Sequence, residues 1–168
     1  MLDKLWLGMR SVAMTLLFPG TVAGIVPYLL LRSTAVWPPR SWTWAQAVGI
    51  ALAIGGVTIL LACVREFALR GQGTLAPFDE PRRLVVQGLY RYLRNPMYVG
   101  VVLTLMGEGV FFESGRLLLY TGCVFLAFNI VAIGYEERRL RWKFGEEYDT
   151  YCRRVGRWIP GRPYRAPE

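Results

Sequence analysis

The longest uncharged run of the chain, SWTWAQAVGIALAIGGVTILLACV, extends from Ser41 to Val64 between Arg40 and Arg65. A helix needs roughly 17–25 mostly apolar residues to cross a bilayer. The core helix of a soluble bundle would keep one polar face towards water, and this run shows no such face. The run therefore predicts a transmembrane helix rather than a buried helix of a soluble protein.

Three further apolar runs extend this prediction. Residues Ser11–Leu31 and Leu117–Tyr135 carry no charge, and a weaker run, Asn95–Phe112, is interrupted only by Glu108. The first run is too long for the apolar part of a signal peptide, so we interpret it as a retained helix. Its prolines and glycines predict a kink and permit close helix packing, which we expect within the chain (Pro19, Gly20, Gly24, Pro27). We predict an all-α integral membrane protein with about four transmembrane helices.

The distribution of basic residues predicts the orientation. The chain has 20 Lys and Arg and a formal net charge of +8, and most of the basic residues precede Ser11, lie in 65–94 or follow Tyr135. The loop 32–40 and the turn at Arg116 hold few. By the positive-inside rule we expect cytoplasmic N- and C-termini in a multi-pass protein of a bacterial inner membrane. The charge then suits membrane lipid headgroups, and we expect no nucleic-acid partner.

The absence of histidine excludes several kinds of chemistry. A Ser-His-Asp triad, a Cys-His dyad and a His-ligated zinc or haem all need an imidazole. The three cysteines, Cys63, Cys123 and Cys152, form no CxxC pair, so we expect neither a disulfide framework nor a metal site. We interpret Cys152 as a packing or surface cysteine rather than a reactive thiol.

The segment Gly71–Gly100, GQGTLAPFDEPRRLVVQGLYRYLRNPMYVG, joins two of the apolar runs. Its Asn95-Pro96 pair predicts the start of a helix, with Pro96 at the first helical position. Asn95 is then either an ordinary N-cap or part of a site. In the second interpretation the free N–H groups of the helix start and Arg94 face a carboxylate or phosphate.

The segment Glu136–Pro160, EERRLRWKFGEEYDTYCRRVGRWIP, follows the last apolar run. Its two adjacent carboxylates are either partners of Arg139 and Arg141 on the helix surface or acceptors for a ribose or a cationic ligand. An apolar stripe at helical spacing follows, and we expect it to pack in a core (Leu140, Phe144, Tyr148, Tyr151, Val155).

Taken together, these pieces resemble the isoprenylcysteine carboxyl methyltransferase family and, more widely, the membrane phospholipid N-methyltransferase superfamily. The matching residues occur in order around an apolar span and cover about half the chain, and they are Leu84, Val85, Gly88, Tyr90, Arg94, Pro96, Tyr98, Gly100, Glu136, Glu137, Leu140, Phe144, Gly145, Tyr148, Tyr151, Val155, Ile159 and Pro160. One position departs from the pattern, because Asn95 stands where the family has a histidine.

The resemblance implies an S-adenosylmethionine-dependent methyltransferase whose cytoplasmic C-terminal helices close a cofactor pocket. The residues implied for the cofactor are Gln87, Gly88, Tyr90, Arg94, Asn95, Pro96, Tyr98, Glu136 and Glu137. Arg94 and Tyr98 are implied as catalytic. Glu108, an ionisable residue within an apolar run, and Arg154 are candidate substrate contacts, with a position near the far interface as the alternative for Glu108. We expect one domain, 1–168, with a two-helix hairpin over 1–64 and a catalytic part over 65–168, whose tail Phe144–Pro160 covers the cofactor.

The implied acceptor is lipid-like or prenylated. Carboxyl O-methylation is favoured because a carboxylate is ionised at neutral pH and needs no base, while amine N-methylation stays open. Two other classes also remain. A membrane NADPH-dependent enzyme similar to sterol reductases would need basic residues for the 2′-phosphate, and Arg82, Arg83, Arg153 and Arg154 are candidates. A small transporter or assembly factor is the non-enzymatic alternative.

Overall fold

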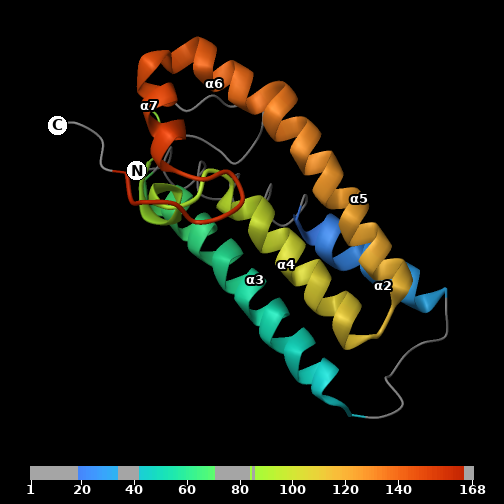
Figure 1. The fold of residues 1–168 in the computed structure, drawn as a ribbon. Helices are drawn as coiled ribbons and strands as arrows, with labels where there is room; N and C mark the ends of the chain where they lie inside the picture. Colours follow the sequence, from blue (N-terminus) through green and yellow to red (C-terminus); the bar gives the residue numbers. More distant parts are fainter. Residues whose placement is uncertain (1–18, 34–41, 71–83, 85, 165–168) are drawn as a thin grey trace, which may run out of the picture. The chain divides into compact units, whose positions relative to one another are not determined.

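The structure, a computed structural model, describes residues 19–33, 42–70, 84 and 86–164, without the side chains of 67–70. Every regular element in these residues is helical, as predicted (Figure 1). The elements are η1 (Thr21–Ile25), α2 (Val26–Arg32), α3 (Trp44–Arg70), η2 (Gly88–Arg91), α4 (Pro96–Phe111), α5 (Gly115–Val131), η3 (Ala132–Glu136), α6 (Glu137–Phe144) and α7 (Glu146–Arg154). η1 and η3 are π-helical turns, and η2 is a 3₁₀ turn.

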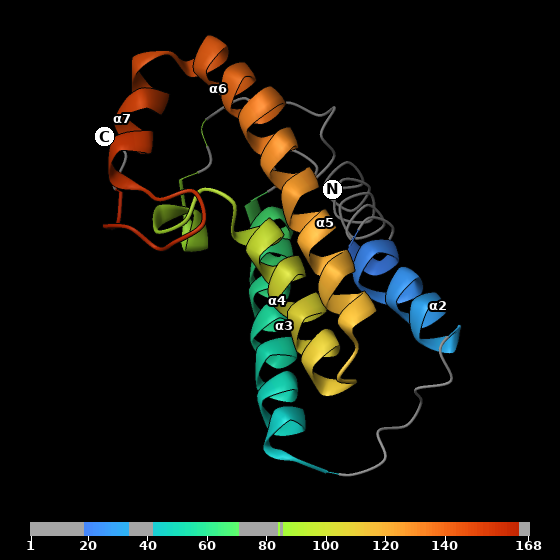
Figure 2. The same cartoon turned by 45° about the vertical axis from the view of Figure 1, so that its right-hand side comes forward.

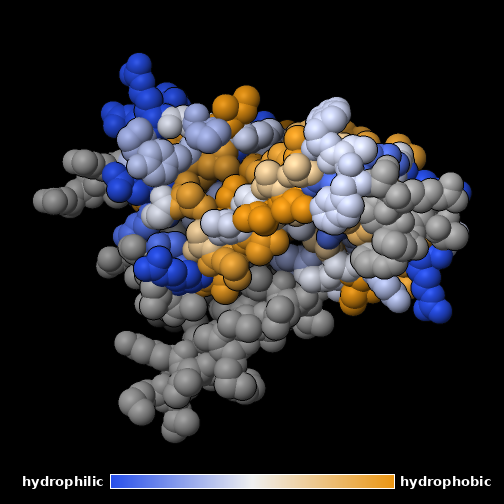
Figure 3. Space-filling model, turned by 90° about the horizontal axis from the view of Figure 1, so that it is seen from below, coloured by the Kyte–Doolittle hydropathy of each residue, from blue (hydrophilic) through white to orange (hydrophobic). Residues whose placement is uncertain are grey.

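In the part of the chain that the structure describes, two helices are long and apolar enough to cross a membrane. They are Trp44–Glu66 and Gly115–Phe144, and the second is formed by α5, η3 and α6 in succession. Only 17% of the most apolar 18-residue stretch of each helix is buried. Leu119, Leu126 and Ile130 on α5 are exposed by 71%, 63% and 73%. Hydrophobic side chains form broad orange areas on the surface in Figure 3. Such exposure argues against the soluble-bundle alternative, whose core helices would be mostly buried.

The other two predicted spans are shorter helices within the described residues. α4 has 16 residues and begins at Pro96, as the Asn95-Pro96 pair predicts. Thr21–Arg32 is the apolar helix that the structure describes for the first run, and residues 11–18 of that run lie outside the described residues. The predicted irregularity there is a π turn, Thr21–Ile25, which precedes Pro27. The count of four transmembrane helices therefore stays a prediction.

The chain forms two compact units, and the first to describe contains Thr15–Leu61 and Met97–Ala127. Here α3 and α4 run side by side (Figures 1 and 2) because glycines bring their backbones together. A Cβ on Gly107 would lie 2.5 Å from the nitrogen of Ala53 and 2.6 Å from the oxygen of Gly49. A Cβ on Gly56 would lie 2.6 Å from the oxygen of Gly100. Only glycine allows this approach, which is typical of helices that pack in a bilayer.

Polar side chains fasten the ends of this unit. Gln46, 1% exposed, donates from Nε2 to the carbonyl oxygen of Phe111 at 3.2 Å and to Oε1 of Glu113 at 3.1 Å. Tyr120 on α5 donates to the carbonyl oxygen of Val22 at 3.1 Å. By contrast, a Cβ on Gly20 or Gly24 would meet nothing within 4 Å, so the predicted packing at these two glycines is not made by the described residues.

The second unit contains Ala62–Pro96 and Phe128–Glu168. Its core holds Val86, Tyr148, Tyr151, Val155 and Tyr164, with Leu140 and Phe144 packed against it. The apolar stripe predicted to be core is therefore core. It spans two helices rather than one, because Gly145 ends α6 and precedes α7 with φ 52° and ψ −125°. Non-glycine residues rarely adopt that conformation, so Gly145 fixes the turn between α6 and α7 seen in Figure 1.

Candidate functional site

The polar site of the second unit begins with the turn at Gly88. Gly88 has φ +58°, and a Cβ there would lie 2.8 Å from the side chain of Glu66, so glycine is required for both reasons. The 3₁₀ turn Gly88–Arg91 follows, and the hydroxyl of Tyr151 on α7 donates to the carbonyl oxygen of Tyr90 at 2.7 Å. This hydrogen bond fastens the turn to the buried core of the unit.

The chain after α7 returns along the segment Arg91–Arg94, and we call residues 155–164 the strap. The nitrogen of Arg94 donates to the oxygen of Gly156 at 2.9 Å, and the nitrogen of Gly161 donates to the oxygen of Tyr92 at 2.8 Å. A third bond joins the nitrogen of Tyr164 to the oxygen of Arg91 at 2.9 Å. A Cβ on Gly161 would lie 2.6 Å from the oxygen of Arg154, so the strap needs glycine to fold this tightly.

An ion-pair cluster joins α6, the strap and the segment before α4. Glu137, 7% exposed, accepts from Nη1 of Arg94 at 3.1 Å through Oε1. Arg157 binds the same carboxylate with both ends of its fork, from Nε to Oε1 at 2.6 Å and from Nη2 to Oε2 at 2.9 Å. The side chains are 10% exposed for Glu137, 14% for Arg94 and 30% for Arg157. The cluster is thus a largely buried network of charge-assisted hydrogen bonds.

The π turn η3 sets which side of the helix carries Glu137. Ala132–Glu136 form one wide turn between α5 and α6, and Glu137 is the first residue of α6. One additional residue in a helix rotates everything after it by about 100° relative to a regular helix. Such turns are frequent at functional sites. The carboxylate at this position is buried as a consequence, whereas Glu136 beside it is half-buried.

The cluster has an excess of positive charge and of hydrogen-bond donors. Two guanidinium groups face one carboxylate, so the three groups together carry one positive charge. Nε of Arg94 and Nδ2 of Asn95 are buried and have no hydrogen-bond partner among the described residues. Unpaired buried donors are costly, which makes them candidates for a ligand acceptor. The hydrogen bond to Glu137 raises the pKa of the Arg157 guanidinium, so this charge persists at every physiological pH.

A thiol and two phenols, all neutral, lie near the cluster. Nη1 of Arg94 also lies 3.1 Å from Sγ of Cys152, a half-buried free cysteine on α7. Burial raises the pKa of the Tyr148 and Tyr151 phenols, so both stay protonated and can only donate or accept hydrogen bonds. No group of three or more Cys, Asp or Glu residues in the described part of the chain could hold a metal ion.

The structure brings several of the predicted cofactor residues together. Arg94 and Glu137 are in contact, Asn95 and Pro96 continue directly from Arg94, and the carbonyl of Tyr90 anchors Tyr151. Gly88 forms the turn, whereas Gln87 before it is exposed. The helix-surface alternative for Glu137 is not what the structure shows, because Arg141 pairs instead with Asp149, Nε to Oδ1 at 2.7 Å.

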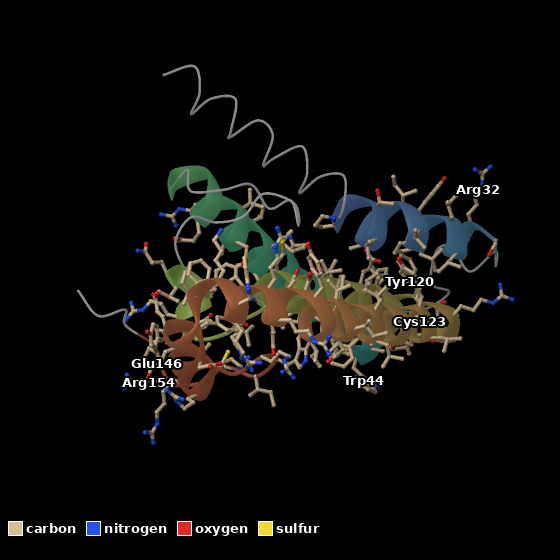
Figure 4. All side chains as sticks on the ribbon, turned by 90° about the horizontal axis from the view of Figure 1, so that it is seen from above. Arg32, Trp44, Tyr120, Cys123, Glu146 and Arg154 are labelled. Atoms are coloured by element: carbon tan, nitrogen blue, oxygen red, sulfur yellow. The ribbon has the colours of Figure 1, made fainter. Side chains whose placement is uncertain are left out.

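Other predicted residues are not part of this cluster. Tyr98 and Glu108 belong to α4 in the other unit. Oε2 of Glu108 is buried and has no hydrogen-bond partner among the described residues. Arg154, labelled in Figure 4, is exposed at the end of α7. Of the arginines considered for a 2′-phosphate, Arg82 and Arg83 lie outside the described residues.

One residue of the cluster was missed from the sequence. Arg157 lies 20 residues after Glu137 and is one of many basic residues in the tail, and it was assigned no role from the sequence beyond the charge asymmetry that predicts topology. No short-range pattern separates it from its neighbours. Its only sequence signal is a position between Gly156 and Gly161, the two glycines of the strap, and that signal has no meaning until the strap is seen to fold back.

The fold and the site define a class of protein: one whose described residues form helices, two of them apolar and long enough to cross a membrane, together with a buried arginine–carboxylate cluster. The model of the phospholipid methyltransferase family matches residues 44–147, which is more than half of the chain. The chain belongs to this family, and the resemblance found in the sequence is confirmed.

Curated relatives are similar over about half of the chain. A probable protein-S-isoprenylcysteine O-methyltransferase of Oryza sativa subsp. indica is 30% identical over 83 residues, 49% of this chain and 44% of that protein. Protein-S-isoprenylcysteine O-methyltransferase B of Arabidopsis thaliana is 30% identical over 82 residues, 49% of this chain and 42% of that protein. Methanethiol S-methyltransferase 1 of Bradyrhizobium diazoefficiens is 35% identical over 82 residues, 49% of this chain and 28% of that protein.

The chain therefore spans less than half the length of these curated relatives. No solved structure matches it.

Proposed function

We propose that this protein is an S-adenosylmethionine-dependent methyltransferase that acts on a lipophilic acceptor, with a carboxylate as the favoured acceptor group. The observation that carries the proposal is the buried cluster of Arg94, Glu137 and Arg157, with its excess positive charge and its unpaired donors. Membership of the phospholipid methyltransferase family supports it. Neither a reductase nor a transporter is favoured by the family or by the relatives.

The residues of the cluster fit the polar ends of this cofactor. Nε of Arg94 and Nδ2 of Asn95 are buried donors that a carboxylate such as that of the methionine moiety would satisfy. A carboxylate has about four acceptor positions, and Glu137 uses three of them on the two arginines. One position on Oε2 remains for a ribose hydroxyl or an ammonium group, which agrees with the role expected for Glu137.

The reaction requires that the acceptor, the methyl group and the sulfur be aligned and that water be excluded, and it does not require proton transfer. If bound, S-adenosylmethionine would supply a sulfonium methyl group, whose carbon an ionised carboxylate of the acceptor would attack in line, and the neutral thioether would leave. A carboxylate is already ionised at neutral pH, so the lack of histidine is compatible with the reaction. Arg94 can hold the cofactor carboxylate or an anionic acceptor in place.

The nature of the acceptor follows from the relatives and from the apolar helices. The relatives are named for O-methylation of isoprenylcysteine and for S-methylation of methanethiol, so carboxylate and thiol acceptors are both represented. We favour carboxyl O-methylation, with amine N-methylation as the remaining alternative. The exposed apolar helices support a location in a membrane, where a lipophilic acceptor is concentrated. Cytoplasmic termini and the strap as a cover for the cofactor belong to the same proposal.

Calorimetry on the detergent-purified protein tests the proposal. We expect S-adenosylhomocysteine to bind and NADPH not to bind. Arg94→Gln should weaken S-adenosylhomocysteine at least tenfold, since it removes a buried charge-assisted partner. Arg153→Gln is the matched control. Arg153 is exposed on α7 and donates to Oγ1 of Thr150, one turn away, at 2.9 Å, so its loss should not change the affinity. Binding of NADPH alone would support the reductase, and binding of neither ligand would reject both enzymes.

A further inference from the structure

We infer that Arg157, supplied by the strap, is the positioning residue that fixes the Glu137 carboxylate and thereby the cofactor site. The inference rests on the proposed function and extends it to a part of the chain beyond the family match, which ends at residue 147. Arg157 makes two hydrogen bonds to Glu137, at 2.6 and 2.9 Å, whereas Arg94 makes one at 3.1 Å.

The bidentate geometry explains why Arg157 orients the carboxylate more strongly than Arg94. Two parallel N–H···O bonds from a planar fork define the plane of the carboxylate, which a single bond cannot do. With its plane fixed, Glu137 presents the free acceptor position of Oε2 in one direction only. The same carboxylate holds Nη1 of Arg94, so Arg157 acts on Arg94 through Glu137.

Holding the strap in place does not require Arg157. The strap makes three backbone hydrogen bonds to the segment Arg91–Arg94, and Nε of Arg91 donates to the oxygen of Tyr164 at 3.3 Å. Nε1 of Trp158 donates to Oδ1 of Asn129 at 3.0 Å. The side chain of Arg157 is therefore available for a different task, and a charged group 70% withdrawn from solvent is not a surface ion pair.

The assay is the affinity for S-adenosylhomocysteine of the full-length protein in detergent, with the melting temperature of the unliganded protein recorded in parallel. We expect Arg157→Gln to weaken binding about tenfold or more, because the acceptor group is no longer held in place. Arg157→Lys keeps the charge but loses the fork, so its affinity should lie between those of the wild type and Arg157→Gln. Arg162→Gln is the matched control, an exposed arginine of the same strap whose removal should change affinity less than twofold.

A double-mutant cycle separates positioning from a merely structural role. If Arg157 acts through Glu137, the variant that combines Glu137→Gln with Arg157→Gln binds no more weakly than Glu137→Gln alone. If the two substitutions instead lower the affinity independently, so that the double variant shows the product of the two single losses, the inference is overturned. It is also overturned by wild-type affinity of Arg157→Gln with a lowered melting temperature, which is the result of simple tethering. If Arg157→Gln does not fold, Arg157→Lys decides by the same criteria. Failure of the wild type to bind would reject the proposed function, and the inference with it.

Discussion

The close contact of α3 and α4 gives the sharpest test of the helix packing. In Gly107→Ala the new Cβ would lie 2.5 Å from the nitrogen of Ala53 and 2.6 Å from the oxygen of Gly49. Ordinary van der Waals contacts of a Cβ begin at 3.4 Å. Both atoms belong to the backbone, so no side-chain rotation relieves the clash. The two helices must separate by nearly 1 Å at this point, and gaps of that size forfeit a quarter to a half of each dispersion contact.

The magnitude follows from two opposing effects. Overpacking costs about 1–3 kcal/mol, and alanine gains about 1 kcal/mol over glycine in a helix. The net loss of about 0–2 kcal/mol corresponds to a melting temperature lower by up to about 8 °C for a chain of this size. Gly122→Ala on α5 is the control, because its Cβ meets nothing within 4 Å. Its melting temperature should stay equal or rise.

Differential scanning fluorimetry on both variants in the same detergent measures the difference. The reasoning is refuted if Gly107→Ala melts at or above the temperature of Gly122→Ala. That result would mean that α3 and α4 do not approach as closely as the structure describes.

Three further predictions concern the unit that holds the site. Glu137→Ala leaves two largely buried guanidinium groups without their shared carboxylate and should lower the free energy of unfolding by about 3–5 kcal/mol. Denaturant titration measures this loss, and a loss smaller than that of Glu137→Gln would contradict the prediction. Gly145→Ala puts a side chain at φ 52°, ψ −125° and should cost about 1–3 kcal/mol, while Gly115→Ala, in open space, should not. Because burial raises the pKa of the Tyr148 phenol from 10.0, the unfolded state ionises first as pH rises, so stability holds below about pH 10 and falls above it. Tyr148→Phe should flatten that fall in melting curves between pH 8 and 11, and an unchanged slope would reject this explanation.

Much of the fold could be predicted because its signals are local. An uncharged run such as 41–64 leaves its helix no polar face, and α3 follows from composition alone. The Asn95-Pro96 pair marks the start of α4 correctly, since proline fixes φ and excludes the preceding residue from the helix. The apolar stripe from Leu140 to Val155 is core, as its spacing predicts. The bend at Gly145 was missed because a period of three and four residues continues across it by chance.

The candidate site was predictable only in part. Arg94 and Glu137 stand in two motifs that occur in order, and the structure puts them in contact. Tyr98 belongs to the same sequence motif as Arg94, and Glu108 lies on the same helix as Tyr98, α4. Both residues are nevertheless assigned to the other unit. The order of motifs along the chain indicates that they belong to one site. The direction of each side chain depends on the rotation of its helix, which the π turn at Ala132–Glu136 changes. The sequence shows no clear signal for that turn.

The sequence by itself determined that this chain is helical and apolar, that it belongs to the phospholipid methyltransferase family, and that its chemistry proceeds without an imidazole. These properties depend on local composition or on the order of motifs along the chain, so they can be predicted without knowing how the helices pack. Only the tertiary structure decided that Glu137 is held by Arg157 rather than by a neighbour on its own helix. That pairing depends on where the strap returns, which is set by backbone hydrogen bonds and by glycines that leave room for it.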